Sequence, residues 1–548
     1  MFHGIRIGDF VIFSFLVCFR VWNALSIKTF FQADEYWQTL EPAHWLVFGY
    51  GYLTWEWTIQ LRSFVYPSLF VPVYWLCDHY DASYWWILNG PKILQGFMCA
   101  VGEYYLFKLT QKLFKDVNFA KLVLVLSVLS PFNYYCYTRT FSNSFETVLT
   151  VIAMYYWPSE LTFLSVNEFN IGQFISALLV AGISCFSRPT SAIIWSYMGS
   201  VLLYRSIYSF KLAGIICITA FGCMLVATIL NTIMDYFFFN QICFPLYNFV
   251  QFNFVKGLAS FYGASNWMFY IVQGIPIIML TNLPFFIVGL ATYKTKTTHR
   301  NVQILNHLLI MGGIYLLIFS CIVHKEFRFI YPLKPFMLIF TALGVQHSLN
   351  SKFERTTKIV IPLLIALSAF LAYYFTQIHE SGVIEITELL RNAILTNKSL
   401  HNPTSVGFFT PCHSTPFQSH FHLSPKEADI WFLTCEPPLH LSDTVLLAHY
   451  RDESDEFYDD FEKFMLENFD PISDYHNKLS QVRNSPENST GNYPHQWPDY
   501  LVIFEHLEAT MDTWLADTAY TKWNRLFNSR FHWDHRRTGD LIIYKQNT

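Results

Sequence analysis

The stretch FVIFSFLVCFRVWNALSIKTFFQADEYWQTL, residues 10–40, joins a long apolar run to a group of acidic residues. A helix crosses a bilayer with about 20 largely apolar residues, and residues 9–27 meet that requirement. Asp34 and Glu35 follow at the point where the chain should leave the membrane. This stretch therefore predicts a membrane helix that brings two adjacent acids to a membrane surface.

The composition of the whole chain agrees with a membrane protein. Of the 548 residues, 53% are hydrophobic and only 14% are charged, whereas soluble domains carry roughly 25% charged residues. The formal net charge is −4, and no stretch resembles the basic footprint of a nucleic-acid-binding protein. We therefore expect an α-helical polytopic membrane protein that binds no nucleic acid.

Hydropathy predicts eleven membrane spans. They are residues 9–27, 86–107, 119–137, 143–158, 171–187, 190–204, 211–231, 271–291, 304–323, 329–347 and 358–377. The segment 64–80 is also apolar, but its two prolines interrupt any single span. We expect that segment to form helices lying along the membrane surface.

Lysine and arginine in short loops assign the sides of the membrane, since such loops are usually cytosolic. The basic loops are 108–121, 205–211, 294–300 and 352–358. With eleven spans, all four fall on one side, and the acidic segment, residues 324–328 and everything after residue 377 fall on the other. Asn397 and Asn488 begin glycosylation motifs, and both lie on that second side.

The chain changes character after residue 377. Charged residues become frequent, while the short apolar runs 431–433, 500–504 and 541–544 are typical of buried strands. We expect a membrane domain at 1–377, with the loop 28–85 on the second side of the membrane, followed by a small α/β domain at 378–548 on that same side.

Two cysteines, Cys412 and Cys435, lie in this polar part of the chain. Such a pair suits a disulfide in an oxidising compartment. A zinc site with neighbouring histidines is the less favoured alternative. These histidines are His413, His420 and His422.

The acids and the basic residues of the same side suggest a chemistry. An ionised aspartate can accept a proton from an attacking hydroxyl within hydrogen-bond reach, and Arg or Lys can bind the charge that develops on a phosphate leaving group. Taken alone, Asp34 would be interpreted as a solvated cap, because a lone acid at a helix end usually is one. The functional interpretation gains weight because several loops of one face carry acids, cations and aromatic residues together.

Four motifs carry a resemblance to a known family. FQADEYWQTLEPAH, YGYLTWEWTIQLRSFVYP, FSRPTS and HKEFRFIYPLKP resemble the dolichol-phosphate-mannose-dependent mannosyltransferases of the endoplasmic reticulum, which have the C-type glycosyltransferase architecture. The resemblance covers about residues 9 to 377. Within the family, ADEYWQ, GYLTWEWT and TPCHSTPFQSHFH (410–422) are most similar to the members that act in glycosylphosphatidylinositol (GPI) anchor assembly.

The resemblance implies an activity. It predicts inverting transfer of an α-1,2-linked third mannose from dolichol-phosphate-mannose to the GPI precursor glycolipid, in the lumen of the endoplasmic reticulum. The partners would be these two lipids and the surrounding membrane lipids. No metal or other cofactor is expected, because the phosphate leaving group of the family is linked to a lipid and not to a nucleotide.

The resemblance also implies that 28–85 is the catalytic luminal loop and 378–548 a luminal domain, and it assigns roles to residues. Asp34 is the expected base and Glu35 its neighbour, although the two roles could be reversed. The motif His324, Lys325, Glu326, Arg328 is expected to hold the donor phosphate. Weaker candidates for an anion site are Arg62, Arg139 and Arg188, and candidates for sugar or loop contacts are Trp37, Trp55 and Trp57.

Several other interpretations stay open. The chain could belong to the N-glycan branch of the same family, or be a lipid or solute transporter, although transporters usually show internal repeats and none is visible. Glu56 and Arg62 could form a structural ion pair. Glu41 and His44 have a spacing that suits metal ligands on a helix, but no third ligand is apparent.

Overall fold

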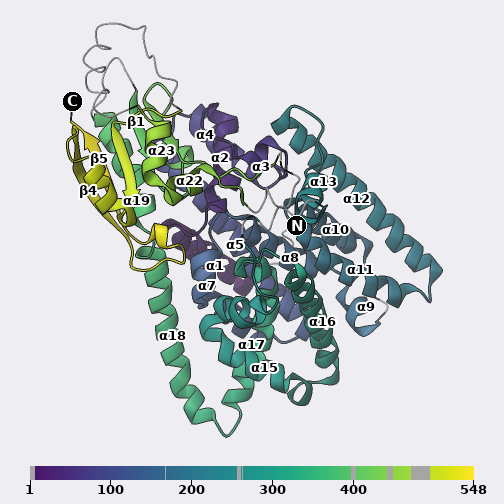
Figure 1. The fold of residues 1–548 in the computed structure, drawn as a ribbon. Helices are drawn as coiled ribbons and strands as arrows, with labels where there is room; N and C mark the ends of the chain where they lie inside the picture. The colour runs from purple at the N-terminus through teal and green to yellow at the C-terminus, as the bar shows by residue number, and fades with distance from the viewer. Residues whose placement is uncertain are drawn as a thin grey trace. The chain divides into compact units, whose positions relative to one another are not determined.

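The protein is described by a computed structural model (Figure 1) over residues 7–166, 168–255, 261, 263–396, 403–439, 441, 449–470 and 494–547. The chain forms two compact units. The helical unit comprises Met1–Ile27, Gln38–Phe48 and Glu56–Thr376, and the α/β unit comprises Lys28–Trp37, Gly49–Trp55 and Gln377–Thr548. The segment around the two acids thus belongs to the α/β unit.

The longer helices of the helical unit follow the predicted spans. They are α1 (Ile7–Ser26), α5 (Tyr84–Phe114), α6 (Val117–Val128), α8 (Ser142–Tyr156), α10 (Ile171–Ser187), α11 (Ala192–Ser206), α12 (Phe210–Phe239), α15 (Leu283–Lys296), α16 (His299–Cys321), α17 (Lys334–Leu349) and α18 (Glu354–Gln377). Shorter helices connect them: α2 (Glu41–Phe48), α3 (Trp55–Thr58), α4 (Val71–His79), α7 (Pro131–Cys136), α9 (Ser159–Leu164), α13 (Pro245–Val250) and α14 (Ile275–Met279). Short segments of π- or 3-10-helix complete the unit: η2 (Pro67–Leu69), η3 (Pro189–Ser191), η4 (Gln251–Val255), η6 (Tyr270–Gly274), η7 (Leu280–Asn282) and η8 (Phe327–Leu333). A further segment, η1 (Tyr36–Leu40), begins in the α/β unit and ends in the helical unit.

Six stretches of the described residues are long and apolar enough to cross a membrane. They are Ile7–Ser26, Phe210–Phe239, Tyr270–Lys296, His299–Cys321, Phe327–Leu349 and Glu354–Thr396. The other predicted spans also fall on helices, but these are shorter or less apolar. The predicted span 119–137 is divided into α6 and α7, because Pro131 can begin a helix but cannot continue one. The protein is therefore a multi-pass membrane protein, and the number of eleven spans stays a prediction.

The spans differ in how deeply they lie within the unit. In the 18-residue apolar window of Phe327–Leu349, the stretch that contains α17, 83% of the residues are buried, whereas the share is 17% in the window of Phe210–Phe239. Helices α15 and α17 pack so closely that a Cβ added at Gly289 would lie 1.9 Å from the Phe340 carbonyl oxygen. Small residues permit such close approach between membrane helices. The segment 324–328 thus lies at the start of the most buried of the six stretches.

A five-stranded sheet forms the centre of the α/β unit, with strand order β2-β1-β3-β5-β4. The strands are β1 (Thr404–Phe408), β2 (Ala428–Phe432), β3 (Tyr500–Phe504), β4 (Tyr520–Ser529) and β5 (Gly539–Gln546). β1 runs parallel to both β2 and β3, while β5 is antiparallel to β3 and β4. Figure 1 shows β4 and β5 in yellow, beside the green segments of the same sheet.

Helices surround this sheet: α19 (Gly382–Thr396), α20 (Gln418–Phe421), α22 (Glu453–Asp459), α23 (Phe461–Asn468) and α25 (Glu508–Trp514), with the 3-10 turns η9 (Glu505–Leu507) and η10 (His535–Arg537). One hydrophobic cluster joins Phe457 and Phe464 of these helices to Leu501 and Ile503 of β3. α19 packs against β4 and β5. Because side chains alternate along a strand, the five buried residues of β3 supply both faces of the sheet.

Three of the five strands coincide with the predicted apolar runs, namely β2, β3 and β5. β1 and β4 were not predicted, because β1 contains Gly407 and β4 carries polar residues on its exposed side. The glycosylation candidates Asn397 and Asn488 lie outside the described residues.

Candidate active site

The segment between α16 and η8 forms a compact charge cluster around Glu326. The Arg328 guanidinium donates two hydrogen bonds to the Glu326 carboxylate, over 2.6 and 2.9 Å. The His324 ring nitrogen Nε2 lies 3.2 Å from the same carboxylate. One acid therefore holds two of the predicted phosphate-binding residues.

In this cluster, burial and ion pairing shift the pKa values of the charged groups in opposite directions. The Arg328 side chain is 5% exposed and the Glu326 side chain 22% exposed. Burial alone would raise the pKa of Glu326, but the charge of Arg328 and the hydrogen bonds from His324 and Arg328 outweigh it and hold that pKa well below its usual range. Likewise, burial opposes protonation of His324, yet its hydrogen bond to Glu326 raises the pKa of the ring. Glu326 is thus ionised at neutral pH and favours the charged form of His324.

Arg188 joins the same cluster from the end of α10. Its guanidinium lies 5.5 Å from the centre of the Phe329 ring, over which Arg328 also lies at 5.8 Å. Asn143, in the first turn of α8, accepts a hydrogen bond from Arg188 over 3.2 Å and donates one to the Arg328 carbonyl over 3.1 Å. The Arg188 Nε also lies 2.9 Å from the buried Glu146 carboxylate. The structure therefore brings two predicted cations together, each with its own carboxylate.

Lys325 points to a different partner. Its ammonium donates a hydrogen bond of 2.9 Å to the Ser265 carbonyl, and the residue is 7% exposed. Glu326 therefore orients Arg328 and not Lys325 through the contacts described. Beside Ser265 lies a cavity of about 420 Å³, and its lining residues are Ser265, Asn266, Met268, Phe269, Val272 and Gln273.

The other two predicted anion-site residues have local partners. The Arg139 Nε donates to the Tyr135 carbonyl over 2.9 Å, and its guanidinium lies 4.6 Å from the centre of the Tyr135 ring. Arg62 donates two hydrogen bonds to Glu56, over 2.9 and 2.8 Å. The contact between Arg62 and Glu56 is the structural ion pair that the sequence analysis considered.

The two acids lie in a tight turn of the α/β unit. Backbone hydrogen bonds from Tyr36 and Trp37 to the Ala33 carbonyl close this turn over 3.0 and 2.9 Å. Glu35 is 8% exposed. Residues 34–37 are called the acidic turn below. Asp34 is on this turn and Arg328 is in the helical unit, so a shared pocket between them stays a prediction.

The three tryptophans predicted to contact a sugar or a loop are all buried. Trp37 is 3% exposed, Trp55 9% and Trp57 2%. Trp57 packs against Phe238 and Phe239 of α12, with ring centres 5.3 and 6.3 Å apart. Trp57 thus joins α3 to α12 within the helical unit.

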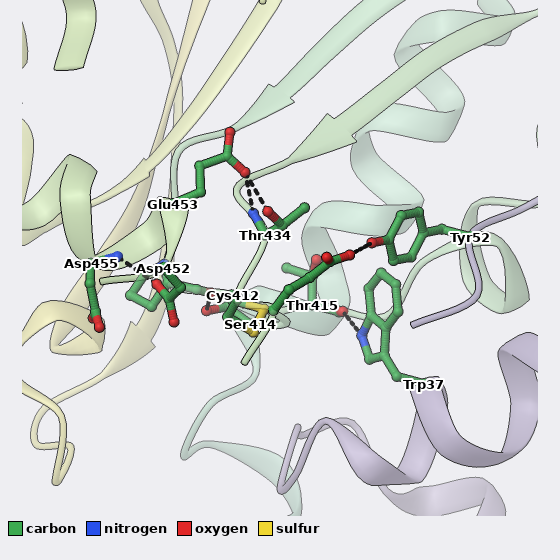
Figure 2. Close-up of a disulfide and its surroundings, with 12 residues drawn as sticks. Trp37, Tyr52, Cys412, Ser414, Thr415, Thr434, Asp452, Glu453 and Asp455 are labelled. Carbon is green, nitrogen blue, oxygen red and sulfur yellow. Dashed lines mark hydrogen bonds between the residues drawn. A yellow bond between two sulfur atoms is a disulfide. The ribbon is translucent and has the colours of Figure 1, made fainter. Parts of the chain in front are cut away.

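Cys412 and Cys435 form a disulfide, with Cα atoms 5.6 Å apart (Figure 2). β1 ends at Phe408 and β2 at Phe432 in a parallel pair, so the segments that follow leave the same edge of the sheet. This register brings the two cysteines together. It also explains why the zinc alternative is not favoured, since both thiols of the candidate metal group Cys412, His413, Cys435 are used in the disulfide.

Some buried charged residues of the membrane helices were not among the predicted site residues. Arg20 of α1 donates two hydrogen bonds to Glu103 of α5, and both side chains are at most 1% exposed. Asp235 of α12 accepts hydrogen bonds from the Phe64 amide and the Ser63 hydroxyl, over 2.7 and 3.0 Å. A charge within a predicted span, as at Arg20 and Glu103, is the signal that could have identified the first pair.

A model of the Alg9-like mannosyltransferase family matches residues 11–422. The chain is 42% identical to GPI mannosyltransferase 3 of Debaryomyces hansenii, over 98% of this chain and 92% of that protein. It is 38% identical to GPI mannosyltransferase 3 of Candida albicans, over 99% of each.

A solved structure shares the fold. ArnT from Cupriavidus metallidurans, bound to undecaprenyl phosphate, is similar with a TM-score of 0.55 at 8% identity, over 98% of each chain. At that identity the similarity concerns the fold alone, which is the C-type glycosyltransferase fold.

Proposed function

The chain belongs to the Alg9-like mannosyltransferase family, and from this premise we propose that it adds the third mannose, in α-1,2 linkage, to the GPI-anchor precursor. The observation that carries the proposal is the similarity to GPI mannosyltransferase 3 over nearly the whole chain. The family membership makes the chain a glycosyltransferase, which removes the transporter alternative. We propose dolichol-phosphate-mannose as donor and the lumen of the endoplasmic reticulum as the place of reaction.

The proposed reaction is a single displacement at the anomeric carbon. The acceptor hydroxyl oxygen forms a bond to that carbon while the bond to the phosphate oxygen breaks, so a β-linked mannosyl phosphate gives an α-mannoside. The hydroxyl proton passes to Asp34, or to Glu35 if the two roles are reversed. Dolichyl phosphate leaves with the bonding electron pair, and no metal or cofactor is required.

The cluster at 324–328 suits the leaving phosphate. Glu326 fixes the Arg328 guanidinium with two hydrogen bonds, which orients it before the substrate arrives. A guanidinium held in this way can stabilise the negative charge that develops on a phosphate without reorganising at the moment of reaction. We propose that Arg328 and His324 bind the donor phosphate, with Lys325 and Arg188 adding positive charge nearby.

Mannose transfer in microsomes tests the base. Asp34→Asn and Asp34→Ala should abolish transfer from dolichol-phosphate-mannose while the protein is still produced, because neither replacement can accept the proton. Asp78→Asn, on the exposed side of α4, is the matched control and should transfer normally. Normal transfer by both Asp34 variants would remove Asp34 as the base.

Depletion of the protein tests the acceptor. Accumulation of a GPI precursor carrying two core mannoses is the expected result. Accumulation of truncated dolichol-linked oligosaccharide would instead assign the protein to the N-glycan branch of the family. Labelling of single cysteines placed at positions 34 and 324 tests whether the two loops face the same side, and labelling from opposite sides would rule out a shared pocket.

A further inference from the structure

The Trp37 indole, three residues after Asp34, is enclosed by the segment that follows β1 and by the last residue of β2. The rings of His413 and Phe417 lie 4.0 and 5.4 Å from it, both at shallow angles of 31° and 19°. Phe432 meets it edge-on at 4.9 Å. Its Nε1–H donates a hydrogen bond of 2.9 Å to the Thr415 carbonyl. This set of contacts fixes both the position and the rotation of the indole.

The disulfide joins the two segments that make these contacts. His413 and Thr415 lie one and three residues after Cys412, and Phe432 precedes Cys435 by three residues. Figure 2 shows the Thr415 carbonyl directed at the Trp37 nitrogen, close to the bridged cysteines. The bridge therefore fixes one side of the Trp37 environment to the other.

Two further contacts hold the bridged segments in place. The Tyr52 hydroxyl donates to Glu436, the residue after Cys435, over 3.3 Å. The Arg537 guanidinium donates to the Cys412 carbonyl over 2.9 Å. The bridge is thus connected to β5 through the turn before it, and to the segment 49–55.

The geometry of the acidic turn transmits this constraint to Asp34. The Trp37 amide bonds to the Ala33 carbonyl over 2.9 Å, so Asp34 lies within a closed turn whose last residue is Trp37. A second anchor lies before the turn, where the Phe30 amide donates to the Glu380 carbonyl over 2.9 Å. With both ends held by residues after position 376, the backbone of Asp34 has little freedom to move.

We propose that the bridged segments 408–417 and 432–436 are a positioning element for the acidic turn, acting through Trp37. Trp37, Thr415 and the Cys412–Cys435 disulfide are positioning residues, and they touch neither substrate. This inference rests on the proposed function of Asp34 as the base. It assigns to the C-terminal α/β unit the task of holding the base in its working position.

Steady-state kinetics of the purified full-length protein test this, with dolichol-phosphate-mannose as donor. Positioning of a base should affect kcat and leave the KM for the donor within about twofold, because misplacing a reacting group slows the chemical step. Trp37→Phe removes one hydrogen bond and should lower kcat about three- to tenfold, and Trp37→Ala about 100-fold. Cys412→Ser combined with Cys435→Ser should lower kcat about tenfold, and reduction of the wild type should have the same effect.

Matched variants separate positioning from general damage. Trp431 precedes Phe432 on β2 and packs on the opposite side, against Phe409 and His495, so Trp431→Phe should leave kcat within twofold. Cys321→Ser replaces an exposed free cysteine and should also be neutral. Resistance to trypsin establishes that each variant is folded.

The outcomes are distinct. If Asp34→Asn abolishes transfer but the folded Trp37 and disulfide variants keep their kcat, the positioning inference is overturned and the base assignment stands. If Trp431→Phe lowers kcat as much as Trp37→Phe, the role of Trp37 is merely structural. Normal transfer by Asp34→Asn would overturn both proposals.

Discussion

The segment 324–328 and the acidic turn 34–37 are built in opposite ways. In the first, the centre of the cluster is local, because Glu326 holds both His324 and Arg328 within five residues, and Arg188 adds to it from the end of α10. In the second, the contacts come from residues nearly 380 positions away, as between Trp37 and Thr415. The comparison teaches that one half of the proposed site is assembled locally, whereas the other half depends on the C-terminal unit.

The largest expected effect tests whether the first region really is local. Glu326→Ala removes the carboxylate that orients Arg328 with two charge-assisted bonds, each contributing about 1.5–3 kcal/mol. We expect kcat/KM to fall about 100-fold, which corresponds to about 2.7 kcal/mol. Transfer assays with donor titration measure it, and Glu354→Ala is the control, since its pair with Lys358 is exposed. Unchanged activity would contradict the role of Glu326.

A smaller effect is expected at the acidic turn. The Tyr36 ring lies 5.5 Å from Phe30 in a stacked arrangement and 5.1 Å from His420 edge-on. Tyr36→Leu should lower the free energy of unfolding by about 1–3 kcal/mol, because two aromatic contacts of about 0.5–1.5 kcal/mol each are lost. Thermal unfolding in detergent measures the change. Tyr204→Leu, at an exposed position, should be neutral, and an equal shift in both would indicate a nonspecific effect.

The pH dependence of stability should reveal the pairing of His324 with Glu326. Since the pKa of His324 is raised in the folded protein, its contribution is fully present below the unfolded pKa of about 6.5, and it is lost as the pH rises through the folded value. The loss is at most about 1.4 kcal/mol per pH unit. Unfolding between pH 5 and 9 should therefore show this decline in the wild type and not in His324→Gln, and identical profiles would contradict the pairing.

At acid pH, the dependence of stability on pH has the opposite sign. Because the pKa of Glu326 is lowered in the folded protein, the stability it contributes is present above about pH 4.5 and is lost as the pH falls below that value. In Glu326→Gln this contribution should be absent.

The smallest effect is expected at Arg62. Its pair with Glu56 has side chains 29% and 12% exposed, and such partly exposed pairs contribute about 0–1 kcal/mol. Arg62→Met should therefore change kcat/KM by less than about threefold, equivalent to about 0.7 kcal/mol. Glu56→Gln should behave alike, since it breaks the same pair. A loss above about 30-fold in Arg62→Met alone would mean that Arg62 binds substrate.

Prediction from the sequence succeeded where the signal is local. The apolar runs located the helices α1, α12 and α16, and the runs at 500–504 and 541–544 located β3 and β5. The motif HKEFRF marks the segment 324–328 as a candidate phosphate site from consecutive residues alone. Predictions were less complete where a residue contributes through a distant partner. β1 and β4 have weak strand patterns, and the partner of Arg20 is 83 residues away.

What the sequence determined by itself is the membrane class, the course of the helices and the two motifs, because hydropathy and local spacing follow from consecutive residues. The tertiary structure alone decided which carboxylate pairs with Arg188 and which side chains enclose Trp37. The physical reason is that a buried charge or indole takes whichever partner the packed chain brings within a few ångströms. That partner can lie hundreds of residues away.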